Sequence, residues 1–140
     1  MDERPGLRIP IATYRVQLGG DVGFEAARGL LPYLHDLGIT DLYASPVLKA
    51  RAGSTHGYDV TDPQSLNPEL GDEASFHALC AELRGRGMGL LLDIVPNHMA
   101  ASAENAWWMD VLEHGRASPW SAVFDVDWRG SAAVGADAED

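Results

Sequence analysis

Three side chains able to bind a ligand follow one apolar run closely: Asp93, Asn97 and His98. Asp93 and His98 are separated by a strand end and its turn, which lets both converge on one ligand, and a histidine there can donate to sugar hydroxyls. Pro96 stiffens the turn and favours a functional interpretation. A structural alternative stays open, in which Asp93 accepts hydrogen bonds from backbone amides and His98 caps a helix. The amide of Asn97 could bind a sugar, a calcium ion or the backbone of its own turn, and the last is the usual case.

Earlier in the chain, an aromatic residue and a carboxylate are adjacent, at Tyr58 and Asp59. A tyrosine ring can stack on the apolar face of a pyranose while a neighbouring carboxylate accepts hydrogens from the sugar hydroxyls. The alternative is a packed tyrosine beside a turn aspartate, and Gly57-Tyr58-Asp59 alone does not decide between them. Together with the group that ends at His98, the pair suggests a carbohydrate site.

The sequence offers no motif for a metal or a nucleotide cofactor. None of its five histidines is arranged as H-x-x-x-H or H-E-x-x-H, so we expect no structural zinc. Gly85, Gly87 and Gly89 precede an apolar run, whereas a dinucleotide fingerprint follows a strand and opens a helix. Cys80 is the only cysteine, which excludes an intrachain disulfide and suggests a small core residue. The four tryptophans could line a groove, although core packing is commoner.

The composition is that of an acidic domain with a core. A chain of 140 residues with 46% hydrophobic content has room for one compact domain or part of one. Its formal charge of -11 and its pI near 4.6 disfavour nucleic acid and anionic membranes as partners. The start of the chain lacks the basic and apolar regions of a signal peptide, and no apolar stretch is long enough to span a bilayer. We therefore expect a cytoplasmic location.

Strand-like and helix-like segments alternate along the chain. β-branched and apolar runs predict strands at Ile9–Leu18, Ile39–Ser45 and Met88–Val95. The near-continuous apolar run of the last one is expected of a strand covered on both faces. Apolar residues at helical spacing predict helices at Phe24–Leu37, Asp72–Arg84 and Glu104–Glu113, with Pro32 either opening a shorter first helix or kinking a longer one. The segment Pro46–Pro68 is expected to be a long functional loop. The small, acidic residues 129–140 are expected to be a disordered tail.

This alternation is typical of an α/β fold with a parallel sheet. Rossmann-type and barrel folds both fit, but the glycine spacing weakens the Rossmann interpretation. A (β/α)₈ barrel places its chemistry at the C-terminal ends of its strands, where Asp59 and the Asp93 to His98 group are expected. We therefore predict that residues 1–128 form the N-terminal portion of a TIM barrel, with about three of its β/α units.

The motifs resemble those of the α-amylase family of glycoside hydrolases. The first signature of that family is an aspartate, three residues, then asparagine and histidine, as in Asp93, Asn97 and His98, and its Gly-Tyr-Asp is matched at Gly57 to Asp59. Longer matches resemble one branch of the family, the maltooligosyltrehalose synthases. These matches lie at Ala12–Leu18, Ser45–Arg51, Gly53–Val60, Asn105–Glu113 and Phe124–Trp128.

The resemblance implies an intramolecular transglycosylase. Such an enzyme converts the reducing-end α-1,4 link of a maltooligosaccharide into an α,α-1,1 link and leaves a terminal trehalose unit. It implies that Tyr58 stacks on the glucose at the cleavage point and that His98 bonds its hydroxyls. Asp59 would anchor this subsite through a later arginine, and Asp93 would support it. Asn97 is a calcium ligand in many amylases, but we do not carry that metal over to this chain.

The resemblance also implies that no catalytic residue lies in this chain. The family's nucleophilic aspartate, acid/base glutamate and third aspartate come from later strands, and a full barrel takes about 250 residues. We therefore expect the isolated chain to be inactive. Two alternatives stay open: a non-catalytic fragment or glucan-binding module, and another hydrolase or transferase of the α-amylase family. The segment Asn105–Glu113 argues against the latter.

Overall fold

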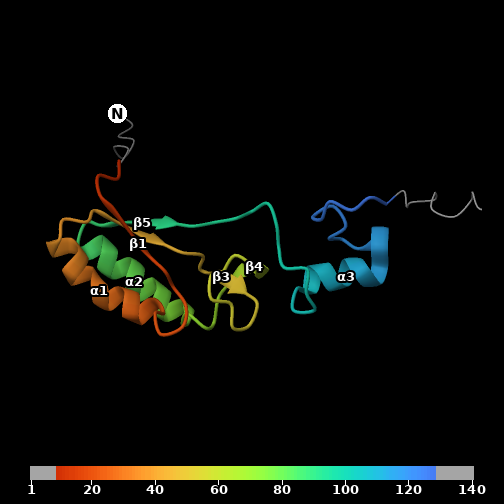
Figure 1. Cartoon of the computed structure of the whole chain (residues 1–140), viewed down its shortest axis with the longest axis horizontal. Helices are drawn as coiled ribbons and strands as arrows, with labels where there is room; N and C mark the ends of the chain where they lie inside the picture. The colour runs from red at the N-terminus through yellow and green to blue at the C-terminus, as the bar shows by residue number, and fades with distance from the viewer. Residues whose placement is uncertain (1–8, 129–140) are drawn as a thin grey trace, which may run out of the picture. The chain divides into compact units, whose positions relative to one another are not determined.

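The computed structural model describes residues 9–128, so the expected disorder of residues 129–140 concerns a segment outside the described residues. The chain divides into two compact units, one reaching to Ala100 and one beginning at Ala101. Figure 1 shows the elements of both units. We describe each unit by itself.

A parallel sheet is the centre of the first unit. It is formed by β1 (Thr13–Val16), β2 (Asp41–Ala44) and β5 (Gly89–Leu92), in the order β1-β2-β5. All pairings are parallel, and Arg15 of β1 lies level with Tyr43 of β2. The three strands expected from the sequence are thus confirmed, although each is shorter than the apolar run that predicts it.

Two helices connect these strands. They are α1 (Phe24–Asp36) and α2 (Glu73–Gly85), and Figure 1 shows them side by side along the sheet. Asp72 caps α2 by accepting a hydrogen bond from the Ser75 amide at 2.8 Å. Pro32 lies inside α1, so the longer of the two predicted helices is the one that forms.

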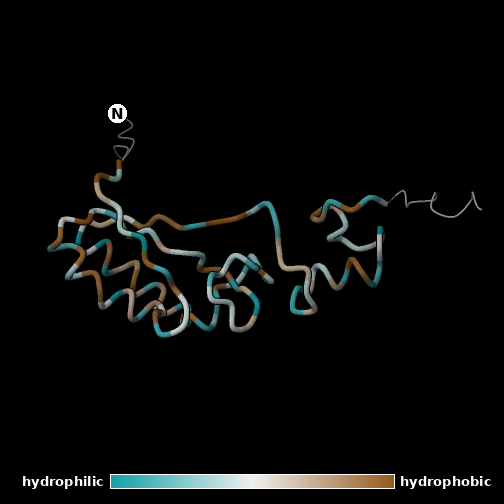
Figure 2. Tube along the Cα trace, in the orientation of Figure 1, coloured by the Kyte–Doolittle hydropathy of each residue, from teal (hydrophilic) through white to brown (hydrophobic). Residues whose placement is uncertain are grey.

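The core of the first unit lies between the two helices and the sheet. Phe24, Leu31 and Leu42 are 0% exposed, and Phe24 meets the edge of the Phe76 ring at a centroid distance of 5.2 Å. Burying side chains of this kind stabilises a fold by about 1.5 to 3 kcal/mol each. Figure 2 shows the apolar residues that alternate with polar ones along both helices. The helices are therefore held to the sheet by one apolar face each.

The interpretation of Pro46 to Pro68 as one long loop is wrong in part. The segment contains an antiparallel hairpin of β3 (Leu48–Ala50) and β4 (Val60–Leu66), with a loop between the two strands. Register shifts on both sides of Lys49 interrupt the pairing, and Pro63 lies within β4. An irregular ladder that includes a proline leaves no regular alternation in the sequence.

A second expectation is also wrong: β5 is not covered on both faces. Leu91 and Leu92 are 37% and 43% exposed, and Ile94 after the strand is 63% exposed. In the described part of the chain, β5 pairs on one side only, with β2. An apolar run predicts a covered strand, but the sequence does not say which strand lies at an edge.

The second unit is small and helical. It contains α3 (Ala106–His114) and the short 3₁₀ helix η1 (Gly115–Ala117). Asn105 is fully buried and caps α3 by accepting hydrogen bonds from the amides of Trp107 and Trp108, at 3.1 and 3.2 Å. The Trp107 ring stacks on the Trp120 ring with their centroids 4.1 Å apart. These two tryptophans therefore pack against each other within this unit, and both are half-buried.

Candidate functional site

The candidate site lies where the strands of the parallel sheet end. Arg15 and Tyr43 stand level on neighbouring strands, and Asp93 follows the last residue of β5. The Asp93 amide donates to the Ala44 carbonyl at 3.0 Å, which continues the pairing beyond the strand and fixes the position of Asp93. In parallel sheets with crossover helices, this edge is where binding sites form.

Asp93 collects hydrogen bonds from two tyrosines. Its Oδ2 accepts from the Tyr58 hydroxyl at 2.6 Å and from the Tyr43 hydroxyl at 3.2 Å. The Nη2 of Arg15 lies 3.6 Å from the same oxygen. The Asp93 side chain is only 14% exposed, so these donors replace much of the water that an exposed carboxylate would bind. The structure therefore joins Tyr58 and Asp93, which the sequence places in the same site.

The network shifts the proton affinities of its members. The hydrogen bond from Tyr58 lowers the pKa of Asp93, and the bonds from Tyr43 and Arg15 act in the same direction. The bond to Asp93 raises the pKa of Tyr58, because losing the phenolic proton would set two negative groups against each other. The bond to Tyr58 raises the pKa of Arg15. At neutral pH, the site thus holds a carboxylate, a neutral phenol and a guanidinium.

The loop that carries Tyr58 is shaped by Asp59. Its Oδ1 accepts a hydrogen bond from the Ser54 hydroxyl, whose oxygen in turn accepts from the Gly57 amide at 3.1 Å. The His56 ring stacks on the Tyr58 ring with centroids 5.8 Å apart. Asp59 therefore stabilises the conformation of the loop that carries Tyr58.

Gly57 is required by the close approach of this loop to Pro46, which lies between β2 and β3. Its φ is +77°, and a Cβ at this position would lie 3.2 Å from both the Cβ and the carbonyl oxygen of Pro46. Any other residue would be strained by its backbone conformation and crowded by Pro46. The backbone conformation and the contact with Pro46 thus explain why a glycine precedes Tyr58.

Asn97 and His98 lie in the turn after β5, and both are exposed. The Nδ1 of His98 lies 3.2 Å from the Oδ1 of Asn97, and this neighbour is the polar partner of the ring within residues 9–128. No hydrogen bond joins His98 to Tyr58 or to Asp93 among these residues. That His98 and Asp93 converge on one ligand remains a prediction.

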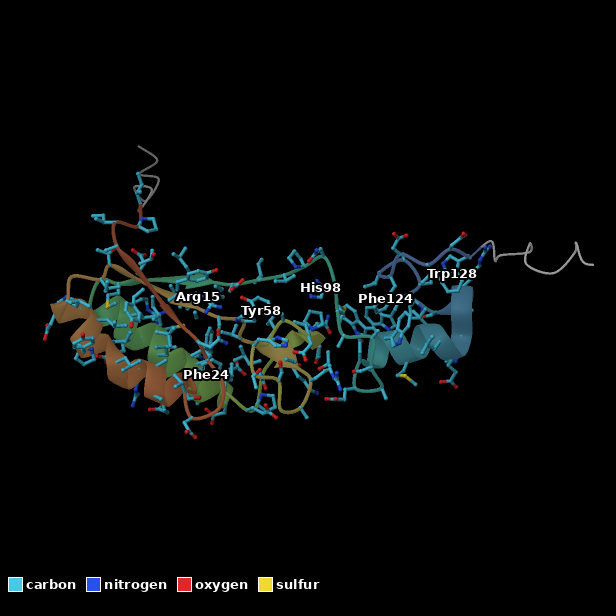
Figure 3. All side chains as sticks on the ribbon, in the orientation of Figure 1. Arg15, Phe24, Tyr58, His98, Phe124 and Trp128 are labelled. Carbon is cyan, nitrogen blue, oxygen red and sulfur yellow. The ribbon has the colours of Figure 1, made fainter. Side chains whose placement is uncertain are left out.

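Sequence reasoning did not select two members of the network, Arg15 and Tyr43. The guanidinium carbon of Arg15 lies 5.5 Å from the centroid of the Tyr43 ring, and Nη2 donates to the Tyr58 hydroxyl at 3.1 Å. Figure 3 shows the side chains of Arg15 and Tyr58 pointing toward each other. A signal exists: Arg15 and Gln17 alternate with the buried Val16 and Leu18, so one face of this segment is polar at its end.

Two further properties concern the same described residues. No three histidine, cysteine, aspartate or glutamate side chains within residues 9–128 gather where they could hold a metal ion. No helix in this part of the chain is both long enough and apolar enough to cross a bilayer.

The site thus joins Asp93, which follows β5 of the parallel sheet, to Tyr58 of the loop between β3 and β4, and comparisons with known proteins show the family to which the chain belongs. Residues 27–130 match the model of the α-amylase catalytic domain, so the chain belongs to the α-amylase family. Within that family, the chain is 51% identical over 125 residues to a putative maltooligosyl trehalose synthase of Mycobacterium tuberculosis. It is 35% identical over 108 residues to the intracellular maltogenic amylase of Bacillus subtilis.

Solved structures give the same result. The chain is similar to the maltooligosyltrehalose synthase of Arthrobacter ramosus, with a TM-score of 0.82 and 40% identity. These neighbours are TIM-barrel enzymes, so the predicted fold class is confirmed: the chain is α/β and corresponds to part of such a barrel. The match covers 86% of this chain and 16% of the Arthrobacter enzyme, and the match to the Mycobacterium protein covers 84% and 16%. The chain therefore spans about a sixth of these relatives.

Proposed function

We propose that this chain is part of a maltooligosyltrehalose synthase that acts on maltooligosaccharides. The enzyme would turn the reducing-end α-1,4 link into an α,α-1,1 link by intramolecular transglycosylation. The observation that carries the proposal is the 51% identity to the Mycobacterium protein, against 35% to the maltogenic amylase. The acidic composition disfavours nucleic acid and anionic membrane surfaces as partners and is compatible with a neutral glucan. The location proposed for the enzyme is the cytoplasm.

Each candidate residue has a role in this proposal. Tyr58 stacks on the glucose at the cleavage point, and its half-buried ring, held by Asp93 through the hydroxyl, supports that role. His98 and Asn97, both exposed, bond the sugar hydroxyls. Asp59 anchors the subsite, and Asp93 acts as its structural support, consistent with its low exposure. No cofactor takes part.

In this proposal, the catalytic carboxylates are supplied by parts of the barrel that are not in this chain. A retaining enzyme of the family needs a nucleophile and an acid about 5 Å apart, on opposite sides of the bond that breaks. Asp59 and Asp93 are both engaged in holding Tyr58 and its loop, which leaves them poorly suited to that task. We therefore expect the purified 140-residue chain to form no product from maltohexaose.

A segment exchange tests the proposed activity. Residues 9–128 of this chain replace the matching segment of the Arthrobacter enzyme, and the chimera is incubated with maltohexaose. We expect non-reducing product, measured as loss of reducing ends and by product chromatography. Circular dichroism and thermal unfolding establish that the chimera is folded.

The matched control is a chimera that carries the same segment from the Bacillus maltogenic amylase. It should not form the non-reducing product, because its loops belong to a different branch of the family. A folded chimera with residues 9–128 that only hydrolyses maltohexaose would refute the synthase assignment. Turnover by the isolated chain would refute the claim that the catalytic carboxylates lie outside it.

A further inference from the structure

Among residues 9–128, Arg15 is the one cation in the polar network at the ends of the sheet strands. It extends from β1 on the face opposite to the buried Val16, and its side chain is 38% exposed. Its guanidinium lies over the Tyr43 ring and reaches Tyr58 with Nη2 at 3.1 Å. Arg15 therefore contacts two aromatic residues that come from different elements.

A second path leads from Arg15 to the loop that carries Tyr58. Its Nη1 donates to the Oε1 of Gln17 at 2.9 Å. The Nε2 of Gln17 donates to the carbonyl oxygens of Leu18 at 3.1 Å and Thr55 at 3.4 Å. One guanidinium thus holds Tyr58 directly, through its hydroxyl, and indirectly, through the backbone of its loop.

The chemistry of the partners fixes the direction of these hydrogen bonds. Arginine has donors and no acceptor, whereas an ionised carboxylate only accepts. The Tyr58 hydroxyl must therefore accept from Arg15 and give its single hydrogen to Asp93, 2.6 Å away. A hydroxyl held from both sides has one orientation, so the ring that carries it is held as well.

We propose that Arg15 is a positioning residue for the candidate sugar site: it keeps the Tyr58 hydroxyl on Asp93, so that the ring is already oriented when glucose stacks on it. Orienting an aromatic side chain before binding removes part of the ordering cost of binding. Lysine would not serve equally, because the planar fork of arginine reaches Gln17 and Tyr58 at once. The inference rests on the proposed function for the stacking of glucose on Tyr58.

The contact is tested without any activity, on the full 140-residue chain labelled with ¹³Cζ-tyrosine. The Tyr58 resonance, assigned by its loss in Tyr58→Phe, is followed through its titration. Arg15 lowers the pKa of Tyr58 and Asp93 raises it, so Arg15→Gln should raise that pKa and Asp93→Asn should lower it. In Arg15→Lys, the pKa of Tyr58 should lie between its values in the wild type and in Arg15→Gln. An unchanged Tyr58 titration in folded Arg15→Gln would overturn the proposal.

The positioning role is tested by a double-mutant cycle in the chimera described above. Arg15→Gln should lower kcat/KM by about tenfold to a hundredfold, the range expected when a binding group is misplaced. In a Tyr58→Phe background the same substitution should have much less effect, because the hydroxyl on which Arg15 acts is gone. Additive losses would overturn the positioning role, since Arg15 would then act independently of Tyr58.

A control separates this role from a general effect of lost charge. Arg28, which pairs with Glu25 on the exposed surface of α1, is replaced by glutamine, and kcat/KM should not change. Arg15→Lys should recover part of the loss. If the unmodified chimera forms no trehalose-type product, the proposed function fails, while the tyrosine titration still decides whether Arg15 holds Tyr58.

Discussion

The two halves of the candidate sugar site are held very differently. Tyr58 and Asp93 lie in a network that spans three strands and a loop, with Asp93 only 14% exposed. Asn97 and His98 lie on an exposed turn, and the polar contact between their side chains is one of 3.2 Å between neighbours in the sequence. Tyr58 and Asp93 are therefore held by contacts between different elements of the fold. The side chains of Asn97 and His98 are held mainly by the backbone of their own turn.

This difference separates two ways of building a binding site. A side chain held by the fold binds a ligand without a large further loss of freedom, whereas an exposed one must be ordered when the ligand arrives. Substitutions in the first half should therefore change stability as well as binding. Substitutions in the second half should change binding almost alone.

The largest expected effect on stability is that of Asp93→Ala. It removes the acceptor of two tyrosine hydroxyls and leaves Arg15 without its carboxylate, which should cost about 1 to 3 kcal/mol of unfolding free energy. Urea unfolding of the 140-residue chain measures the loss. The matched control is Asp36→Ala, whose carboxylate is 84% exposed and should matter by less than about 0.5 kcal/mol. Equal losses for both variants would mean that the network adds nothing to stability.

A smaller expected effect is the pH dependence of the stability that Asp93 contributes. The pKa of Asp93 is lower in the folded chain than its ordinary value near 3.8, so its contribution to stability is present above that value. The contribution is lost as the pH falls through the folded pKa. The stability difference between wild type and Asp93→Asn should therefore be largest near neutral pH and shrink in acid. Urea midpoints measured from pH 7 down to pH 2.5 test this, and a constant difference would contradict it.

The fold could be predicted where periodicity was strong. The helices α1 and α2 follow from apolar residues at helical spacing, because each helix buries one face, and the three parallel strands follow from β-branched and apolar runs between them. The hairpin of β3 and β4 could not be predicted in this way. Its pairing is irregular and Pro63 interrupts it, so its strands carry neither alternation nor an apolar run.

The site could be predicted where polar residues end an apolar run. Asp93 stood out for that reason and Tyr58 as an aromatic residue beside a carboxylate, and the structure joins them. Arg15 and Tyr43 were missed because their role depends on the register of β1 against β2, a tertiary property. The polar alternation of Arg15 and Gln17 marked the right face, but only the packed sheet shows which loop that face meets.

The smallest expected effect on stability is that of His98→Ala. Its ring is exposed, and its polar contact within residues 9–128 is with the adjacent Asn97, so the unfolding free energy should change by no more than about 0.5 kcal/mol. In the chimera, kcat/KM should nevertheless fall, because this side chain is proposed to bond the sugar hydroxyls. Asp93→Ala is the variant for comparison, because it should lower both the unfolding free energy and kcat/KM. If His98→Ala destabilised the chain as much as Asp93→Ala does, the turn would be ordered by the fold, and the contrast between the two halves would fail.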